Sequence, residues 1–402
     1  MSEVVAIISM LHESVANHSA IRQFRGQSVL AWTLRRLAKV QRISSAFILC
    51  WDDQSPRVAE VDRPACINIA CKGRRRALDH LDAVAAAGRW MDGWRGGLLQ
   101  TCDFDLGFHG AWIVELIGDA DALLIDPNAA LIDPELINAL FERADEQADL
   151  DMFFSQAAPG LNGVLVRSSV LRQLAAANQH PGKLLHYLPE RPSRDPISGE
   201  ACIEVAAEIA RTSHRFKLDS RRQIEQVEAA TSDLNGTLID VDAAELVRRL
   251  TVQKQGWATA PREITLELTT RRSTFPAFGP ARHFPVNRPE LSADLARILF
   301  RELAEIDDLR LTFGGVGDPL CHPAFFEIVE AARTAGIHAI HVETDLYEID
   351  SAQVAGLAEA GIDIISVNLP AITAQTYQRL MGIDGYAQVI QNIRQLVLRR
   401  QG

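Results

Sequence analysis

The order of strand-like and helix-like segments constrains the fold of this chain most. Short apolar runs such as Val4–Ser9 alternate with amphipathic stretches such as Ser28–Val40, which places leucines on one helical face. Repeated alternation of this kind is typical of mostly parallel sheets covered by helices. The pattern stops in the polar segment Thr231–Gly236 and begins again at Ile264–Thr270. The sequence therefore predicts two α/β domains.

The predicted boundaries follow from that interruption. A chain of 402 residues has room for two or three domains of about 100–200 residues each. We predict a first domain at 1–232 with a Rossmann-like mixed sheet, a helical linker at 233–260, and a second domain at 261–402. The second domain contains four βα units in succession, because strand and helix signals alternate four times after residue 261.

Charge and composition exclude several kinds of partner and site. The net charge of −11 argues against general binding of nucleic acid or of a membrane surface, since both need a basic face. The first apolar run ends at His12 and Glu13, and no run approaches the roughly 18 apolar residues of a membrane span. We therefore expect a cytoplasmic protein. Its six irregularly spaced cysteines do not predict a disulfide framework.

Three stretches of the second domain resemble the radical SAM superfamily, whose enzymes cleave S-adenosylmethionine with an iron–sulfur cluster. These stretches are Leu311–His322 (LTFGGVGDPLCH), His341–Asp345 (HVETD) and Ile362–Met381. The resemblance implies a partial (βα)4 radical-SAM-type half barrel and a four-iron, four-sulfur cluster. It also implies that an altered pocket for S-adenosylmethionine is formed by Gly314, Gly315, Gly317, Asp318, Glu343, Thr344, Ser366 and Asn368.

The chain departs from that family where the cluster would be bound. The family holds its cluster with three cysteines in the loop after its first strand, and this loop reads RRSTFPAFGP. Register from the strand puts Arg272, Pro276 and Gly279 at the three cysteine positions. Thiolates are the ligands that iron–sulfur clusters require. We therefore predict no cluster, no metal site and no cleavage of S-adenosylmethionine. Asp318, one methylene shorter than the usual glutamate, weakens the expected cofactor site further.

The same loop is basic and aromatic. Arg271, Arg272 and Arg282 are candidates for binding a phosphate or carboxylate, and the alternative is a solvated basic loop. We also predict that three phenylalanines of this loop fill the volume that a cluster would occupy: Phe275, Phe278 and Phe284.

The first domain resembles the nucleotidyltransferase fold of sugar cytidylyltransferases over Val4–Leu37 and again at Pro127–Glu135. That resemblance implies CTP and Mg²⁺. Register puts Asn128 at the magnesium aspartate, and Asp126 is the weak alternative. No glycine occurs from Ser9 to Arg25, and Gln27 replaces the expected lysine. We name no catalytic residue beyond Asp126 and Asn128, and predict that Asp133 caps the helix that follows it.

The two resemblances in this order match the spiro-SPASM family, of which the chain resembles a shortened member without cluster cysteines. We predict a pseudoenzyme that binds a ligand or a partner and needs no cofactor. The partner is a protein or a second copy that covers the open edge of the fourth strand, or a small anionic ligand. The alternatives are a nucleotidyltransferase-type enzyme acting on a sugar or small molecule through Asp126, and a radical SAM enzyme with unusual cluster ligation.

Overall fold

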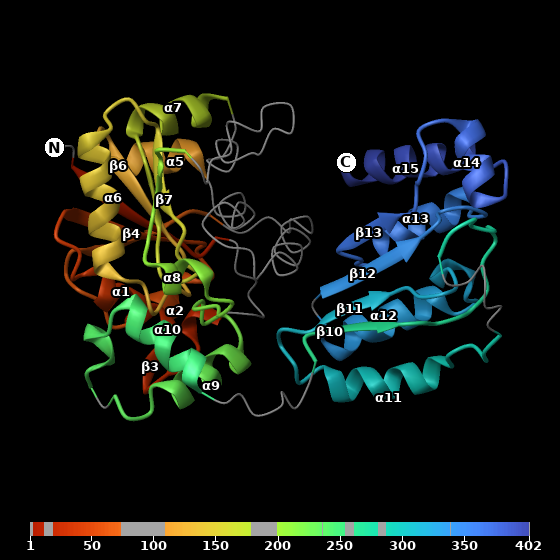
Figure 1. The fold of residues 1–402 in the computed structure, drawn as a ribbon, viewed down its shortest axis with the longest axis horizontal. Coiled ribbons are helices and arrows are strands. Elements are labelled where there is room, and N and C mark those ends of the chain that lie inside the picture. Colours follow the sequence, from red (N-terminus) through yellow and green to blue (C-terminus); the bar gives the residue numbers. More distant parts are fainter. Residues whose placement is uncertain are drawn as a thin grey trace. The chain divides into compact units, whose positions relative to one another are not determined.

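The computed structural model describes residues 3–11, 19–73, 109–177, 199–234, 236–253, 261–279, 287–337 and 339–401. The described residues up to 253 and those from 261 form two separate compact units. Each unit is an α/β assembly of its own (Figure 1).

The first unit is built on a seven-stranded sheet in the order β5-β4-β1-β6-β8-β7-β9. The central strand β1 runs parallel to β4 and β6, whereas β8 runs antiparallel to both of its neighbours. The strands span Val4–Ser9 (β1), Ile43–Cys50 (β4), Ile67–Cys71 (β5), Asp121–Ile125 (β6), Met152–Ser155 (β7), Val164–Val166 (β8) and Cys202–Ile203 (β9). A small antiparallel pair, β2 (Gln23–Phe24) and β3 (Gln27–Ser28), precedes the first helix.

Helices cover both faces of this sheet, because alternate strand residues enter two different cores. One core contains Ile8 and Ile48, and the other contains Ile7 and Leu49. The helices are α1 (Val29–Leu37), α2 (Ser55–Ala59), α5 (Gly110–Ile117), α6 (Pro134–Glu146), α7 (Ser168–Ala176), α8 (Ala207–Arg211), α9 (Arg221–Ala230) and α10 (Ala243–Val252). Short 3-10 turns occur at Ser19–Ile21 (η1) and Leu238–Asp240 (η6).

The predicted linker contains α10, which lies in the first unit. Its buried residues Ala243, Leu246 and Leu250 join a third core around Phe216 and Trp32. An apolar helical face of this kind needs burial, and the neighbouring α8 and α9 supply it. The first unit therefore extends beyond residue 232.

The second unit is a four-stranded parallel sheet in the order β10-β11-β12-β13. Its strands span Glu263–Leu266 (β10), Arg310–Phe313 (β11), Ala339–Thr344 (β12) and Ile364–Val367 (β13). Its helices are α11 (Ala293–Leu303), α12 (Phe325–Ala335), α13 (Ser351–Glu359), α14 (Ala374–Met381) and α15 (Tyr386–Gln401), with a 3-10 turn η8 at Pro319–Cys321. Apolar residues of the sheet and of α11, α12 and α13 share one core.

The predicted fold class is confirmed: a mixed, parallel-rich α/β sheet is followed by four parallel βα units. Strand β13 is at one end of its sheet, as expected for the fourth strand of an open half barrel. In the described parts of the chain, no helix combines the length and the apolar content needed to cross a bilayer.

Candidate functional site

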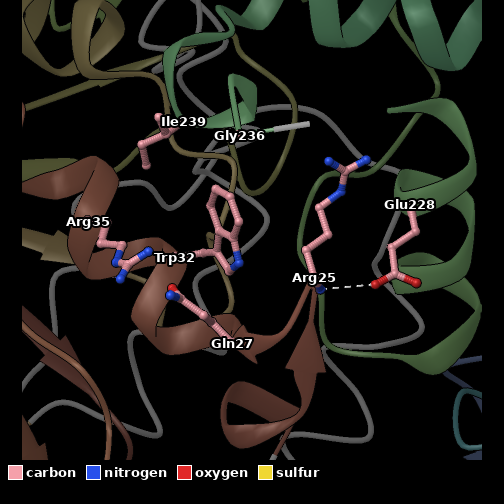
Figure 2. A pocket seen from close by; sticks show the side chains of 7 residues that line it. All are labelled: Arg25, Gln27, Trp32, Arg35, Glu228, Gly236 and Ile239. Carbon is pink, nitrogen blue, oxygen red and sulfur yellow. Dashed lines mark hydrogen bonds between the residues drawn. The ribbon is translucent and has the colours of Figure 1, made fainter. Parts of the chain in front are cut away.

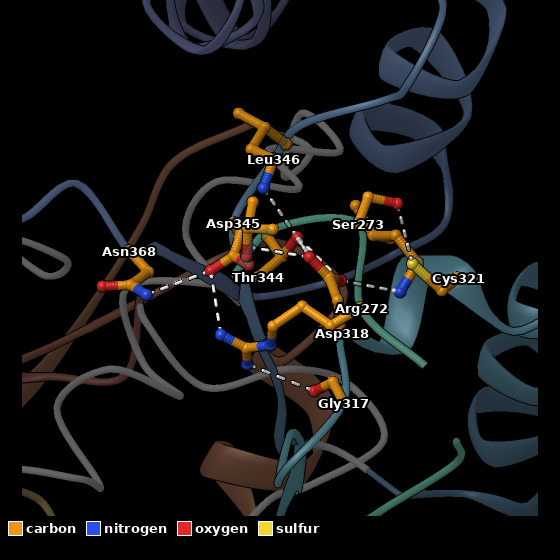
Figure 3. Close-up of polar contacts among 11 residues, drawn as sticks. Arg272, Ser273, Gly317, Asp318, Cys321, Thr344, Asp345, Leu346 and Asn368 are labelled. Carbon is orange, nitrogen blue, oxygen red and sulfur yellow. Dashed lines mark hydrogen bonds and ion pairs between the residues drawn. The ribbon is translucent and has the colours of Figure 1, made fainter. Parts of the chain in front are cut away.

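Polar side chains from all four loops at the carboxyl ends of β10–β13 meet in the second unit. Arg272 and Thr274 follow β10, Asp318 follows β11, Asp345 follows β12, and Asn368 follows β13 (Figure 3). The carboxyl edge of a parallel sheet is where α/β proteins bind their ligands. We therefore treat this cluster as the candidate site.

Asp345 is the centre of the cluster and is only 1% exposed. One of its carboxylate oxygens lies 3.2 Å from an Arg272 guanidinium nitrogen and accepts a 3.0 Å hydrogen bond from the Asn368 amide. The other accepts a hydrogen bond from the Thr274 hydroxyl. The Asp345 carboxylate is thus held by one ion pair and by two hydrogen bonds from neutral side-chain donors of the chain itself.

Asp318 is the second buried carboxylate of the cluster. It accepts hydrogen bonds from the Thr344 hydroxyl at 2.9 and 3.0 Å, from the Asp345 amide at 2.8 Å and from the Leu320 amide at 2.9 Å. Burial raises the pKa of Asp318 above its ordinary value, and the charge of Asp345 adds to that rise, although the hydrogen bonds oppose it. This aspartate holds the loops after β11 and β12 together.

The glycine turn after β11 fits closely against the chain's own residues. A Cβ atom on Gly314 would lie 2.8 Å from a carboxylate oxygen of Glu343, and one on Gly315 would lie 2.6 Å from a carboxylate oxygen of Glu267. A Cβ on Gly317 would lie 2.1 Å from the carbonyl oxygen of Thr269. Gly317 is required because its neighbour is backbone, and Gly315 because its φ is +130°, whereas at Gly314 the flexible end of Glu343 would have to move.

The loop after β10 carries the three positions where the resemblance expects cysteines, and it is bound to α14. The amides of Phe275 and Ala277 donate to the carbonyls of Met381 and Leu380, at 2.8 and 2.6 Å. In this arrangement Arg272 points into the cluster, whereas Pro276 is half-buried and Gly279 is exposed.

The prediction that phenylalanines fill the volume of a cluster is wrong for the two that the structure describes. Phe275 is 72% exposed and Phe278 is 43% exposed. The backbone hydrogen bonds to α14 turn this part of the loop outward, and the Arg272–Asp345 pair occupies the interior instead. Phe284 lies outside the described residues.

The basic residues of the loop are paired with acids of the same unit. Arg271 lies 2.5 Å from a carboxylate oxygen of Glu290, Arg272 pairs with Asp345, and Arg288 pairs with Glu267. Arg282 lies outside the described residues. The two predicted anion-binding arginines that the structure describes therefore already have carboxylate partners.

The face of the sheet on the side of Glu267 and Glu343 is polar. His341 in β12 connects two neighbouring strands, because its Nδ1 lies 3.3 Å from the Thr312 hydroxyl and its Nε2 lies 2.8 Å from the Ser366 hydroxyl. Burial lowers the pKa of His341. Ser366 thus contacts a histidine of the sheet and does not take part in the Asp345 cluster.

The donor set does not fit an iron–sulfur cluster. Among the described residues, no group of three or more His, Cys, Asp or Glu side chains is arranged to hold a metal ion. Among the described residues of the second unit, Cys321 is the single cysteine. Its sulfur lies 3.6 Å from the Ser273 hydroxyl. Burial raises the pKa of Cys321, which disfavours the thiolate form that iron binds. One such thiol cannot replace three.

In the first unit, the candidate metal residues follow β6 and are held by the chain itself. The Asp126 carboxylate lies 2.6 Å from the Lys217 ammonium, and both side chains are nearly buried. The backbone amide of Asn128 donates to the Asp126 carboxylate at 2.7 Å, and the backbone carbonyl of Asn128 accepts from the backbone amide of Leu218 at 2.9 Å. Asp126 is the acid of these two candidate residues, and its charge is balanced by Lys217. The sequence analysis had assigned no role to this lysine.

Asp133 caps α6, which confirms the prediction. Its carboxylate accepts from the Glu135 amide at 2.9 Å and from the Ala243 amide at 2.7 Å. The second bond attaches the start of α10 to the N-terminus of α6, which no local sequence signal indicated.

A second candidate site is a cavity of about 660 Å³ beside α1. Figure 2 shows Arg35 and Trp32 of α1 on one side, and Arg25 with Glu228 of α9 on the other. The Arg25 amide donates to the Glu228 carboxylate at 3.1 Å, and its guanidinium donates to the Leu234 carbonyl at 3.0 Å. The cavity offers an aromatic wall and charges of both signs.

Two sequence comparisons with known proteins each match part of this chain. Residues 270–399 match the family model described as the Radical SAM superfamily. The probable GTP 3′,8-cyclase of Metallosphaera sedula is 34% identical over 80 residues, which are 20% of this chain and 25% of that protein. The chain thus spans about a quarter of the length of the curated relative it matches.

Two solved structures are similar to the first half at a low level. A cytidylyltransferase from Leptospira borgpetersenii is 13% identical with a TM-score of 0.42, over 64% of this chain and 100% of that one. The 4-diphosphocytidyl-2C-methyl-D-erythritol synthase from Anaerococcus prevotii is 10% identical with a TM-score of 0.36, over 57% of this chain and 96% of that one. No activity of the first unit follows from these two similarities. The residues matched by the family model lie within the second unit.

Proposed function

We propose that this protein is a relative of radical SAM enzymes that has lost both cluster and S-adenosylmethionine chemistry, and that it acts by binding a ligand or a protein partner. The observation that carries the proposal is the Arg272–Asp345 pair at the carboxyl edge of the second sheet. A cation stands at the position where the family resemblance requires the first of three thiolates.

The surroundings of the pair support the same proposal. S-adenosylmethionine carries a positive sulfonium, which the Arg272 guanidinium would repel. Glu343 and Glu267 lie against the two glycines whose family role is to admit the methionine amine of the cofactor. Because both carboxylates lie close to Gly314 and Gly315, the space beside the turn is already in use.

Ligand binding finds support in the cavity of the first unit. A volume of about 660 Å³ accommodates a small molecule, since ligand pockets commonly measure about 300–1,000 Å³. Trp32 offers an aromatic surface, Glu228 offers a carboxylate, and Arg35 offers a guanidinium that also pairs with the exposed Asp62. The chemistry favours a small polar ligand with a planar group. For a protein partner, strand β13 at the end of its sheet is the surface we favour.

A nucleotidyltransferase activity of the first unit has less support. Magnesium is bound mostly by carboxylates and phosphates, and the Lys217 ammonium competes for the single carboxylate at Asp126. Calorimetry with CTP and Mg²⁺ decides between the two functions, and binding at millimolar CTP would favour the enzyme.

Anaerobic reconstitution with iron and sulfide tests the proposal directly. We expect no charge-transfer absorbance from iron bound to thiolate, only background iron, and no heat of binding with S-adenosylmethionine. An active radical SAM enzyme treated in parallel serves as the positive control. Brown protein with about four irons per chain would refute the loss of the cluster.

A further inference from the structure

Two cysteines at the edge of the first sheet lie side by side, although they are far apart in the chain. Cys50 ends β4 and Cys71 ends β5, and the two are direct partners in the parallel register. Their sulfur atoms are 3.5 Å apart. We propose that Cys50 and Cys71 form a reversible disulfide when a peroxide oxidises the protein.

The backbone geometry suits this bond. Neighbouring strands are about 4.8 Å apart, which lies within the range of about 4.4–6.8 Å between the Cα atoms of disulfide-linked residues. The sulfur atoms must close from 3.5 Å to about 2.0 Å, a change that side-chain rotation at two strand ends can supply. Two backbone bonds beyond the cysteines keep the strands aligned, from the Lys72 amide to the Cys50 carbonyl and from the Asp52 amide to the Gly73 carbonyl.

The two thiols have different roles in the reaction because their exposure differs. Cys71 is exposed and meets the oxidant, whereas Cys50 is fully buried. The Cys71 thiolate attacks one peroxide oxygen and becomes a sulfenic acid, the O–O bond breaks, and the hydroxide that leaves takes up the proton released by the Cys71 thiol to form water. The Cys50 sulfur then attacks the sulfenic sulfur, the S–O bond breaks, and the hydroxide takes the Cys50 proton and leaves as a second water. Two thiols and one hydrogen peroxide thus give one disulfide and two waters.

The second step is the slower one. Burial, the contact with Cys71 and the charges of Asp52 and Asp53 raise the pKa of Cys50 to about 12. Little thiolate is therefore present at Cys50, and the sulfenic acid at Cys71 lasts long enough to be trapped.

The bond would fix the edge of the sheet. Among the described strands, β5 is at the end of the seven-stranded sheet and pairs with β4. A covalent link across that pair closes a chain loop and restricts the unfolded state. For a unit of this size we expect the melting temperature of the first unit to rise by on the order of 5–10 °C on oxidation.

The test uses the full chain, reduced and then treated with hydrogen peroxide. Remaining thiols are alkylated, and peptides are mapped by mass spectrometry. We expect a peptide pair linked through Cys50 and Cys71, and a higher melting temperature that dithiothreitol reverses. Cys71→Ser should lose both effects, whereas Cys66→Ser, which removes an exposed thiol one residue before β5, should keep both.

A further variant keeps the proposal open to refutation if Cys71→Ser is unstable. Cys50→Ala removes the resolving thiol, so a dimedone adduct should accumulate at Cys71 after peroxide. Linkage of Cys71 to another cysteine, or oxidation of Cys71 to the sulfinic acid in wild type with no bond to Cys50, would overturn the proposal. An equal melting temperature before and after full linkage would overturn the stabilisation of the sheet edge.

Discussion

Replacing Arg272 with methionine tests whether the cluster at the carboxyl edge of the second sheet is held by its ion pair. Methionine keeps the apolar stem and removes the cation that faces Asp345 at 3.2 Å. Removing one partner of a buried pair costs about 3–5 kcal/mol, because the remaining charge stays buried without its counterion.

For Arg272→Met, the structure indicates a smaller loss of stability than this range. The Arg272 side chain is 20% exposed, so water screens part of the interaction, and Asp345 keeps its bonds from Thr274 and Asn368. We therefore expect the free energy of unfolding of the second unit to fall by about 2–3 kcal/mol.

Hydrogen exchange followed by mass spectrometry measures the stability of the second unit separately from that of the first. Amides in β11 and β12 exchange through opening of the unit, so their exchange should become about 30- to 140-fold faster at 2–3 kcal/mol. Arg297→Met is the matched control, because Arg297 forms exposed ion pairs with Asp294 and Glu327, and we expect no measurable change there.

A double-mutant cycle with Asp345→Asn completes the test. With the carboxylate neutralised, Arg272→Met should cost clearly less than it does in wild type, since no unpaired buried charge remains. Equal costs in both backgrounds, or an Arg272→Met variant that exchanges like Arg297→Met, would refute the reasoning.

Three further predictions concern other parts of the chain. Lys217→Met removes the ammonium that lies 2.6 Å from the nearly buried Asp126 carboxylate, so we expect the first unit to lose about 3–5 kcal/mol in urea unfolding, largely recovered by adding Asp126→Asn. Gly317→Ala brings a methyl group within 2.1 Å of the Thr269 carbonyl, so soluble expression of the full chain should drop sharply, and an unchanged melting temperature would contradict the close approach. Burial raises the folded-state pKa of Asp318, so the folded state binds this proton more tightly than the unfolded state. Stability should therefore fall as the pH rises above about 4 and through that raised pKa, and Asp318→Asn should remove this slope in urea titrations, at the separate cost of the Asp345 amide bond.

Much of the fold could be predicted from the sequence, because periodicity and capping are local. The alternation that begins at Ile264 gave four parallel βα units, and Asp133 was identified as a helix cap from the proline that follows it. The extent of the first unit could not be predicted in this way. The attachment of α10 depends on a bond from the Ala243 amide to Asp133, and on packing against residues distant in the chain.

The candidate site shows the same limit. Motif register places Arg272 and Asp318 in loops and Thr344 at the end of β12, and these positions lie at one edge because the carboxyl ends of parallel strands meet there. Side-chain partners were not predictable: the sequence places Asp345 only at the end of the stretch HVETD, yet its carboxylate is the centre of the cluster. Lys217 and the contact between Cys50 and Cys71 have no local signature, since each depends on residues brought together by the sheet.

The hydrogen bonds between the loop after β10 and the end of α14 have a consequence for the order in which the second unit is made. During synthesis, Phe275 and Ala277 leave the ribosome long before the carbonyls of Leu380 and Met381 that receive their amides. The loop therefore completes its structure only after translation has passed α14. A ribosome stalled before that helix would carry a nascent chain in which this loop is open to proteases.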